Sequence, residues 1–244
     1  MDITTGTRDH GLYVIRTVGT QSWAEDSWQA HGVHLELMDG PRSLAVCKLE
    51  VAGTLEAEER GAEEAQAIEP WTHTMRYLAA VKQLEQRLGH ARQLLDEAQH
   101  CEETVRGMEE YQAAALRAMA TPTELEQADP RDEYDPHAPL AHLIVTRLER
   151  EVDEGRRKAL AFAPDPTVAP IHPAWELPGR LAGMPASSLA REIAQGLLAG
   201  WAAMRDLRDP LITWAVKGAE VTRTEVQQTT GVSRSTINRL LPAD

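Results

Sequence analysis

The sequence predicts a mostly helical protein with a small β-rich region at its N-terminus, and three observations support this. Apolar residues between 70 and 161 recur every three or four positions, which is the period of amphipathic helices. Strand-like alternation of apolar and polar residues is confined to residues 1–55. Aromatic residues are scarce, with six Trp, four Tyr and one Phe, which favours helical packing over a large β core.

The β-rich region, residues 1–55, predicts a hairpin. Residues 33–37 alternate apolar and polar side chains, and residues 43–51 alternate again. Between them, residues 39–42 (Asp-Gly-Pro-Arg) form a turn sequence. We therefore expect a hairpin over 32–52 within a small sheet, one face of which a helix or a partner must cover.

Residues 56–162 predict a helical region built around one long helix from Pro70 to about Met119, on the order of 70 Å in length. Its apolar residues are spaced like a coiled-coil seam. Two interpretations remain open: a dimerisation rod, or one helix of an antiparallel bundle whose partner is the next helix of the same chain. The seam comprises Val81, Leu84, Leu88, Ala91, Leu95, Ala98, Cys101, Val105, Met108, Ala115 and Met119.

The next segments are a loop, a second helix and a linker. Residues 121–136 are polar, acidic and punctuated by proline, which predicts a loop. A second amphipathic helix follows and ends near Ala161. Residues 163–186 are rich in proline and predict an extended linker, from which Trp175 and Leu177 are expected to dock on a neighbouring part. The predicted domains are therefore 1–55, 56–162, 163–186 and 187–244. The inward side chains of the second helix are Leu140, Leu143, Ile144, Leu148 and Val152.

The C-terminal domain, 187–244, predicts one helix from Ser188 to Leu207 and then three short helices. Asp209 can cap the first short helix, with Pro210 at its first position and Gly218 at its end in a left-handed conformation. The apolar face of the helix before them carries Leu189, Ile193, Leu197, Trp201 and Met204, wide enough to pack on the short helices or to pair with its copy in a dimer.

The second and third short helices carry start signals of their own. Thr222 and Glu225 have the spacing of a capping box, and Ser233 can cap the third helix. Gly231 between them tolerates the positive φ of a tight turn. The small core expected here consists of Leu211, Trp214, Ala215, Val226, Val232, Ile237 and Leu240.

These residues resemble the three-helix helix-turn-helix family of bacterial repressors and resolvase C-terminal domains. The resemblance covers residues 209–241 and is carried by Glu225-Val226, Gly231-Val232-Ser233-Arg234 and Thr236-Ile237. The position four before the glycine, usually alanine in that family, is Gln227.

The resemblance implies that residues 233–241 form a recognition helix in the major groove of double-stranded DNA. Arginine and asparagine there can bind guanine and adenine, and helix N-termini favour phosphate. The alternative is that the same helices form a helical hairpin that binds another protein. The residues implied in DNA binding are Thr222, Arg223, Ser233, Arg234, Ser235, Thr236, Asn238 and Arg239.

The net charge of the whole chain, −13, is unfavourable for DNA binding, but the distribution of the charges matters more than their sum. Residues 54–110 hold thirteen acidic and six basic residues, whereas 201–244 hold five acidic and six basic ones. So few cations bind DNA weakly in a single copy, because affinity comes largely from phosphate neutralisation. We therefore expect an oligomer, most simply a homodimer.

The remaining patterns exclude other classes. We find no phosphate loop, nucleophile elbow or paired-cysteine zinc spacing, so we expect no enzyme, no catalytic residue, no metal and no cofactor. No apolar run approaches the length of a membrane span. Two distant cysteines and no signal peptide predict a protein of the cytoplasm, associated with the nucleoid. The predicted function is sequence-specific DNA binding in transcriptional regulation, with an effector left open. The alternatives are a coiled-coil scaffold and an accessory subunit of a recombination or packaging complex.

Overall fold

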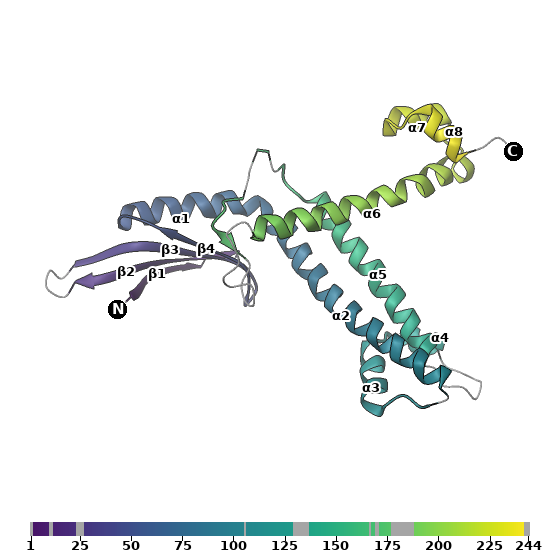
Figure 1. Cartoon of the computed structure of the whole chain (residues 1–244). Coiled ribbons are helices and arrows are strands. Elements are labelled where there is room, and N and C mark those ends of the chain that lie inside the picture. The colour runs from purple at the N-terminus through teal and green to yellow at the C-terminus, as the bar shows by residue number, and fades with distance from the viewer. Residues whose placement is uncertain are drawn as a thin grey trace.

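The structure is a computed structural model that describes residues 2–9, 12–22, 27–104, 106–128, 137–165, 167–168, 171–176 and 188–241. It is mostly helical with a small antiparallel sheet at the N-terminus, as predicted. Three arms meet near the centre of the molecule (Figure 1). One arm is the sheet with helix α1, the second is a pair of long helices, and the third is helix α6, which carries the C-terminal helices at its far end.

The sheet is a meander in the order β1-β2-β3-β4-β5, with every pair antiparallel. The predicted hairpin is confirmed as β3 and β4, in which Leu35 pairs with Cys47. Two further strands within the predicted β-rich region, before the hairpin, and the short β5 extend the sheet beyond the predicted hairpin. The strands are β1 (Asp2–Asp9), β2 (Tyr13–Ser22), β3 (Ser27–Asp39), β4 (Arg42–Glu50) and β5 (Trp175–Glu176).

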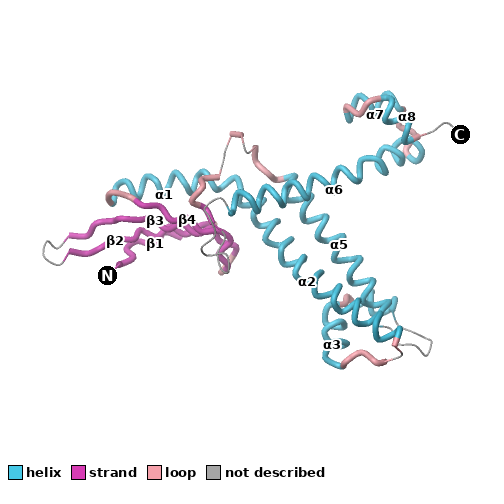
Figure 2. The backbone as a smooth tube through the Cα atoms, in the orientation of Figure 1, coloured by secondary structure: helices cyan, strands magenta, loops and turns pink. Residues whose placement is uncertain are grey.

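Helix α1 (Thr54–Ile68) covers one face of the sheet (Figure 2). Its buried residues Ala57, Ala65 and Ile68 share a hydrophobic cluster with alternate residues of β3 and β4. Trp175 of β5 joins this cluster with 1 % of its surface exposed, so the predicted docking of Trp175 is confirmed, whereas Leu177 lies outside the described residues. The N-terminal unit thus extends past the predicted boundary at 55.

The long helix predicted from Pro70 to Met119 is wrong in its second half. The 3-10 turn η1 (Glu69–Trp71) leads into α2, which spans Thr72–Glu103, and a separate helix, α3, spans Glu110–Met119. Thr104 is the C-cap of α2, and its hydroxyl donates to His100 O (2.7 Å). Gly107 lies in the connection, where its low helix propensity costs nothing.

The seam of α2 packs inside the same chain. Val81, Leu88 and Ala91 are buried against α5 (His137–Ala161), which supplies Leu140, Ile144, Leu148 and Val152. Of the two interpretations, the antiparallel intramolecular pair is therefore the one observed, and this seam is not free to dimerise. The inward residues predicted for α5 are buried, except Leu143, which is half-buried.

The predicted loop 121–136 contains a helix, α4 (Pro122–Ala128), and residues 129–136 lie outside the described part of the chain. Thr121 and Glu124 form the start signal that the loop prediction overlooked. The Glu124 carboxylate accepts from the N–H and the hydroxyl of Thr121, and the Glu124 N–H donates to that hydroxyl.

Helix α6 runs unbroken from Ser188 to Gly218, with Pro210 inside it. The predicted new start at Asp209 is therefore wrong. A proline inside a helix removes one backbone hydrogen bond and costs about 3 kcal/mol, which the packing of both ends of α6 offsets here. Gly218 does end α6, but the left-handed residue is Glu220 (φ 56°) and not Gly218. None of the described helices is long and apolar enough to cross a membrane.

The first half of α6 is anchored in the molecule and the second half projects from it. Leu189 and Ile193 are buried in the cluster of the sheet. Gly200 crosses α5 so closely that a Cβ there would lie 2.5 Å from Arg156 O, which is backbone and cannot move aside. Beyond Gly200, α6 extends past the end of α5 to the C-terminal helices (Figure 1).

The C-terminal unit consists of the end of α6, α7 (Arg223–Thr230) and α8 (Arg234–Leu240). Its core holds Ile212, Val226, Ile237 and Leu241, with Val216, Val221, Val232 and Leu240 at the edge. The predicted contributions of Leu211, Trp214 and Ala215 are wrong. Leu211 and Trp214 are 60 % and 63 % exposed, because the unbroken α6 turns the adjacent Ile212 toward α7 and α8 instead.

Candidate nucleic-acid interface

The start of α7 has the predicted capping box. Thr222 Oγ1 accepts from the Glu225 N–H (3.2 Å), and Glu225 Oε2 accepts from the Thr222 N–H (2.8 Å) and hydroxyl (2.7 Å). These two hydrogen bonds from Thr222 lower the pKa of Glu225. The Thr222 hydroxyl is therefore engaged in the cap, although its residue is exposed.

The turn between α7 and α8 depends on Gly231, which has φ 68° and ψ 2°. Ser233 then caps α8 by accepting from the Thr236 N–H (3.3 Å). The Ser233 hydroxyl also lies 3.0 Å from that of Ser235 and 2.9 Å from that of Thr236. Three of the predicted DNA-contacting hydroxyls thus form one cluster at the start of α8.

Arg223 joins the two helices across the unit. Its guanidinium donates to Asn238 Oδ1 (3.0 Å) and to Leu241 O (2.9 Å). The contact holds the last turn of α8 against the first turn of α7. It also fixes the direction of the Asn238 amide, whose oxygen accepts from the guanidinium.

The outer side of α8 carries the predicted base-reading residues. Arg234, Ser235, Asn238 and Arg239 are exposed, Thr236 is half-buried, and Ile237 beneath them is fully buried. Within the described residues, Arg234 and Arg239 have no ion-pair partner within 4.0 Å, whereas Arg205 and Arg208 are paired with Asp206 (3.1 Å) and Asp209 (2.7 Å). The two exposed arginines of α8 can therefore reach a ligand without breaking an ion pair to another described residue.

Gln227 stands where the helix-turn-helix family usually has alanine. Its side chain is exposed, and its backbone carbonyl accepts a hydrogen bond from the Gly231 N–H (2.9 Å) at the end of α7. The long side chain therefore does not separate α7 from α8, and Val226 next to it is buried in the shared core.

A second group of residues that sequence spacing did not predict meets beneath α1. Cys47 of β4, Glu64 of α1 and His172 place one ligand atom each within 4.8 Å of one another and could hold a metal ion. They are 17 and 108 residues apart in sequence, so only the fold brings them together.

Hydrogen bonds hold two members of this group, His172 and Glu64, in place. His172 Nδ1 accepts from the Ala174 N–H (3.1 Å), which leaves the proton on Nε2, the nitrogen 3.9 Å from Glu64 Oε1. Glu64 Oε2 also accepts from Trp175 Nε1 (3.2 Å). Burial, and after it the Glu64 carboxylate, raises the pKa of the Cys47 thiol to about 12. The thiol is thus protonated and unreactive at neutral pH, and the group serves to fasten residues 171–176 to the sheet.

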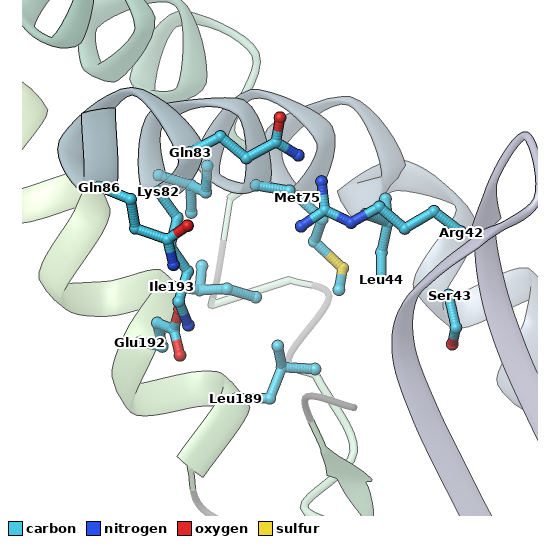
Figure 3. Close-up of a pocket in the computed structure, with 12 residues that line it drawn as sticks. Arg42, Ser43, Leu44, Met75, Lys82, Gln83, Gln86, Leu189, Glu192 and Ile193 are labelled. Carbon is cyan, nitrogen blue, oxygen red and sulfur yellow. The ribbon is translucent and has the colours of Figure 1, made fainter. Parts of the chain in front are cut away.

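A cavity of about 170 Å³ lies between the start of β4, helix α2 and the first turns of α6 (Figure 3). Leu44, Met75 and Ile193 supply apolar walls, and Arg42 lies at the rim. Lys82 and Glu192 across it form an ion pair (2.9 Å). Apolar walls with a few polar groups are typical of small-molecule sites. A ligand in this cavity would contact α6, the helix that carries the C-terminal unit.

Comparisons with known proteins add no further assignment. Neither the family models, nor the curated proteins, nor the solved structures contain a match to this chain. The candidate site therefore stands on its own geometry.

Proposed function

We propose that the chain is a sequence-specific DNA-binding protein, a transcriptional regulator of the nucleoid that acts as an oligomer. The observation that carries the proposal is the outer side of α8. Arg234, Asn238 and Arg239 are exposed there on a helix whose opposite side is packed on α6 and α7. These are the side chains that read guanine and adenine in a major groove.

The capped and tethered geometry of the unit supports the same proposal. A recognition helix needs a fixed orientation, since base contacts demand positions accurate to a fraction of an ångström. Ser233 fixes the start of α8, and Arg223 fixes its end through Leu241 O. The exposed Arg234 and Arg239 lie at the two ends of α8, within reach of phosphates on either side of a groove.

Charge supports action as an oligomer. Of the six basic residues in 201–244, Arg205, Arg208 and Arg223 are bound to groups of their own chain. That leaves Lys217, Arg234 and Arg239 to bring positive charge to the DNA in each copy. Because affinity follows the number of neutralised phosphates, two copies on one site are needed for tight binding.

An interaction scaffold is the second candidate, and the exposed apolar side chains of α6 favour it. Leu198, Trp201 and Trp214 are each more than half exposed. In that case the C-terminal unit would dock on protein. The two candidates differ in their response to salt, because only phosphate binding releases counterions.

The deciding experiment is selection of DNA by the purified full-length protein. Random duplexes and genomic fragments are incubated with the protein, recovered and sequenced over several rounds. Enrichment of a short, two-fold symmetric site whose affinity falls with salt is the expected result. No enrichment over the input, with affinity independent of salt from 50 to 200 mM, would favour the scaffold instead.

A further inference from the structure

Helix α6 carries one apolar seam along its whole length, and only half of it is covered. Ile193, Leu197 and Gly200 lie on it four and three residues apart and pack inside the molecule. The same alternation of three and four continues through Met204, Leu207, Leu211 and Trp214. These four are 50 %, 46 %, 60 % and 63 % exposed.

No described part of the chain covers the second half of this seam. Helix α5 ends at Ala161, beside the middle of α6, and beyond that point α6 runs alone toward α7 and α8 (Figure 1). The C-terminal unit packs on a different side of α6, through Ile212 and Val216. The spacing of three and four is that of helices that pair side by side.

We propose that residues 204–214 of α6 pair with the same residues of a second copy, antiparallel and centred near Asp209. Antiparallel pairing about this centre sets Met204 opposite Trp214 and Leu207 opposite Leu211, in both halves of the contact. A surface that is complementary to itself is what a two-fold dimer requires, since the same patch serves both subunits.

The exposed seam supplies a large part of the area that a dimer needs. With roughly 100–150 Å² on each large side chain, its four exposed residues present on the order of 500 Å². A stable interface buries about 800 Å² on each partner. The four are Met204, Leu207, Leu211 and Trp214.

The charges of this part of α6 do not oppose the approach of two copies. By helical spacing Arg208 lies beside the seam, whereas Arg205, Asp206 and Asp209 lie on the outer side of the helix. Arg208 is paired with Asp209 (2.7 Å) inside each helix, so its charge is balanced within its own copy. The acidic excess of the chain lies elsewhere, in residues 54–110.

The pairing would also set the distance between the two C-terminal units, a consequence that rests on the proposed function. Gly218 at the end of α6 is nine residues from Asp209, so the two ends would be about 27 Å apart at 1.5 Å per residue. Helices α7 and α8 lie at these ends. Two recognition helices on neighbouring half-sites are about 34 Å apart, which this arrangement can reach.

The test is the mass of the full-length protein in solution without DNA, by sedimentation equilibrium from about 1 to 100 µM. Twice the chain mass of 27.0 kDa, 54 kDa, is expected for the natural chain. Leu207→Glu and Leu211→Glu should each weaken the dimer at least about 100-fold, because they place carboxylates in the seam. Unchanged helical circular dichroism is expected, since both side chains are exposed in one copy.

Leu55→Glu is the matched control, because Leu55 is 71 % exposed on α1, far from the seam, and it should stay dimeric. Orientation is tested by oxidation of mixed chains: Met204→Cys with Trp214→Cys should cross-link, and Trp214→Cys alone should not. A natural chain that stays at 27.0 kDa, or a Leu211→Glu variant that stays dimeric, would overturn the pairing. Cross-linking of Trp214→Cys alone would overturn its direction. Because no DNA is present, failure here leaves DNA binding to be judged separately.

Discussion

At the scale of single residues, α8 separates the side chains that hold the unit from those free to contact a ligand. Ser233 and Arg223 have internal hydrogen bonds, and Ile237 is fully buried. Arg234 is exposed and has no ion-pair partner among the described residues. The function proposed for α8 therefore depends most directly on Arg234.

Arg234→Ala should weaken binding to the selected DNA site by about 1–3 kcal/mol, the value of a bidentate contact with guanine. Gel-shift titration at fixed salt measures it. Arg150→Ala removes an exposed arginine of α5 and should leave affinity unchanged. Equal effects of the two substitutions would mean that Arg234 contributes only net charge.

Gly231→Ala should destabilise the C-terminal unit by about 1 kcal/mol, because alanine is strained at φ 68°. Sterics play no part, since a Cβ there meets no atom within 4 Å. Gly89→Ala makes the same change inside α2, also in open space, and should stabilise α2 by about 0.5–1 kcal/mol. Hydrogen exchange of the amides of α7 and of α2 measures the two changes in stability. If both substitutions changed stability in the same direction, the backbone conformation of Gly231 would not be the cause.

At the scale of elements, a buried ion pair fastens α4 to α5. Glu124 is 6 % exposed and accepts from Arg147 Nε (2.8 Å), while Arg147 also donates to Met119 O (2.9 Å). Burial opposes ionisation of Glu124, but the hydrogen bonds from Thr121 and Arg147 outweigh it and lower the pKa of Glu124. These contacts close the tip of the α2–α5 pair.

Because its pKa is lowered on folding, Glu124 stabilises the native state above the usual glutamate pKa of about 4.3, and this is lost as the pH falls. Glu124→Gln should lower the unfolding free energy by about 1–3 kcal/mol at pH 7 and by less at about pH 3. Denaturant titration at both pH values measures it. Glu126→Gln, an exposed change on the same helix, should stay within about 0.5 kcal/mol. A Glu124 effect that grew in acid would contradict the assigned charge.

At the scale of the whole molecule, α6 connects three parts. Its start is buried against the sheet, its middle crosses α5 at Gly200, and its end carries the C-terminal unit. The cavity lined by Ile193 lies on the same helix. A dimer through the second half of α6 would bring two C-terminal units to one DNA site.

The salt dependence of DNA binding follows from this arrangement. In each copy three cations, Lys217, Arg234 and Arg239, are not bound by any described group of their own chain, so a dimer brings about six positive charges to the DNA, and the slope of log K against log salt should be near −5. Leu211→Glu, bound as a monomer, should show a slope of about −3. Binding measured by fluorescence anisotropy between 50 and 200 mM salt gives both values, and equal slopes would contradict binding as a dimer.

The sequence by itself determined the elements whose signals are local. The alternation in β3 and β4, the helix period of α5, the capping box at Thr222 and the glycine turn at Gly231 all act over a few residues, so spacing alone predicted them. The residues of α8 were assigned to an inner and an outer side by the same periodicity. Whether that outer side binds DNA stays a prediction.

Only the tertiary structure decided what depends on contacts between distant residues. The α2 seam could pair with another chain or with α5, and its local pattern is the same in both cases. Pro210 favours the start of a helix and costs about 3 kcal/mol in its interior. That α6 nevertheless continues through it, and that Ile212 and not Leu211 joins the core, follows from how α6 is held at its far end. Cys47, Glu64 and His172 lie close together only because the sheet and α1 pack on each other. Their spacing in the sequence could not predict this, since a contact between distant segments, unlike a helix cap, has no local sequence signal.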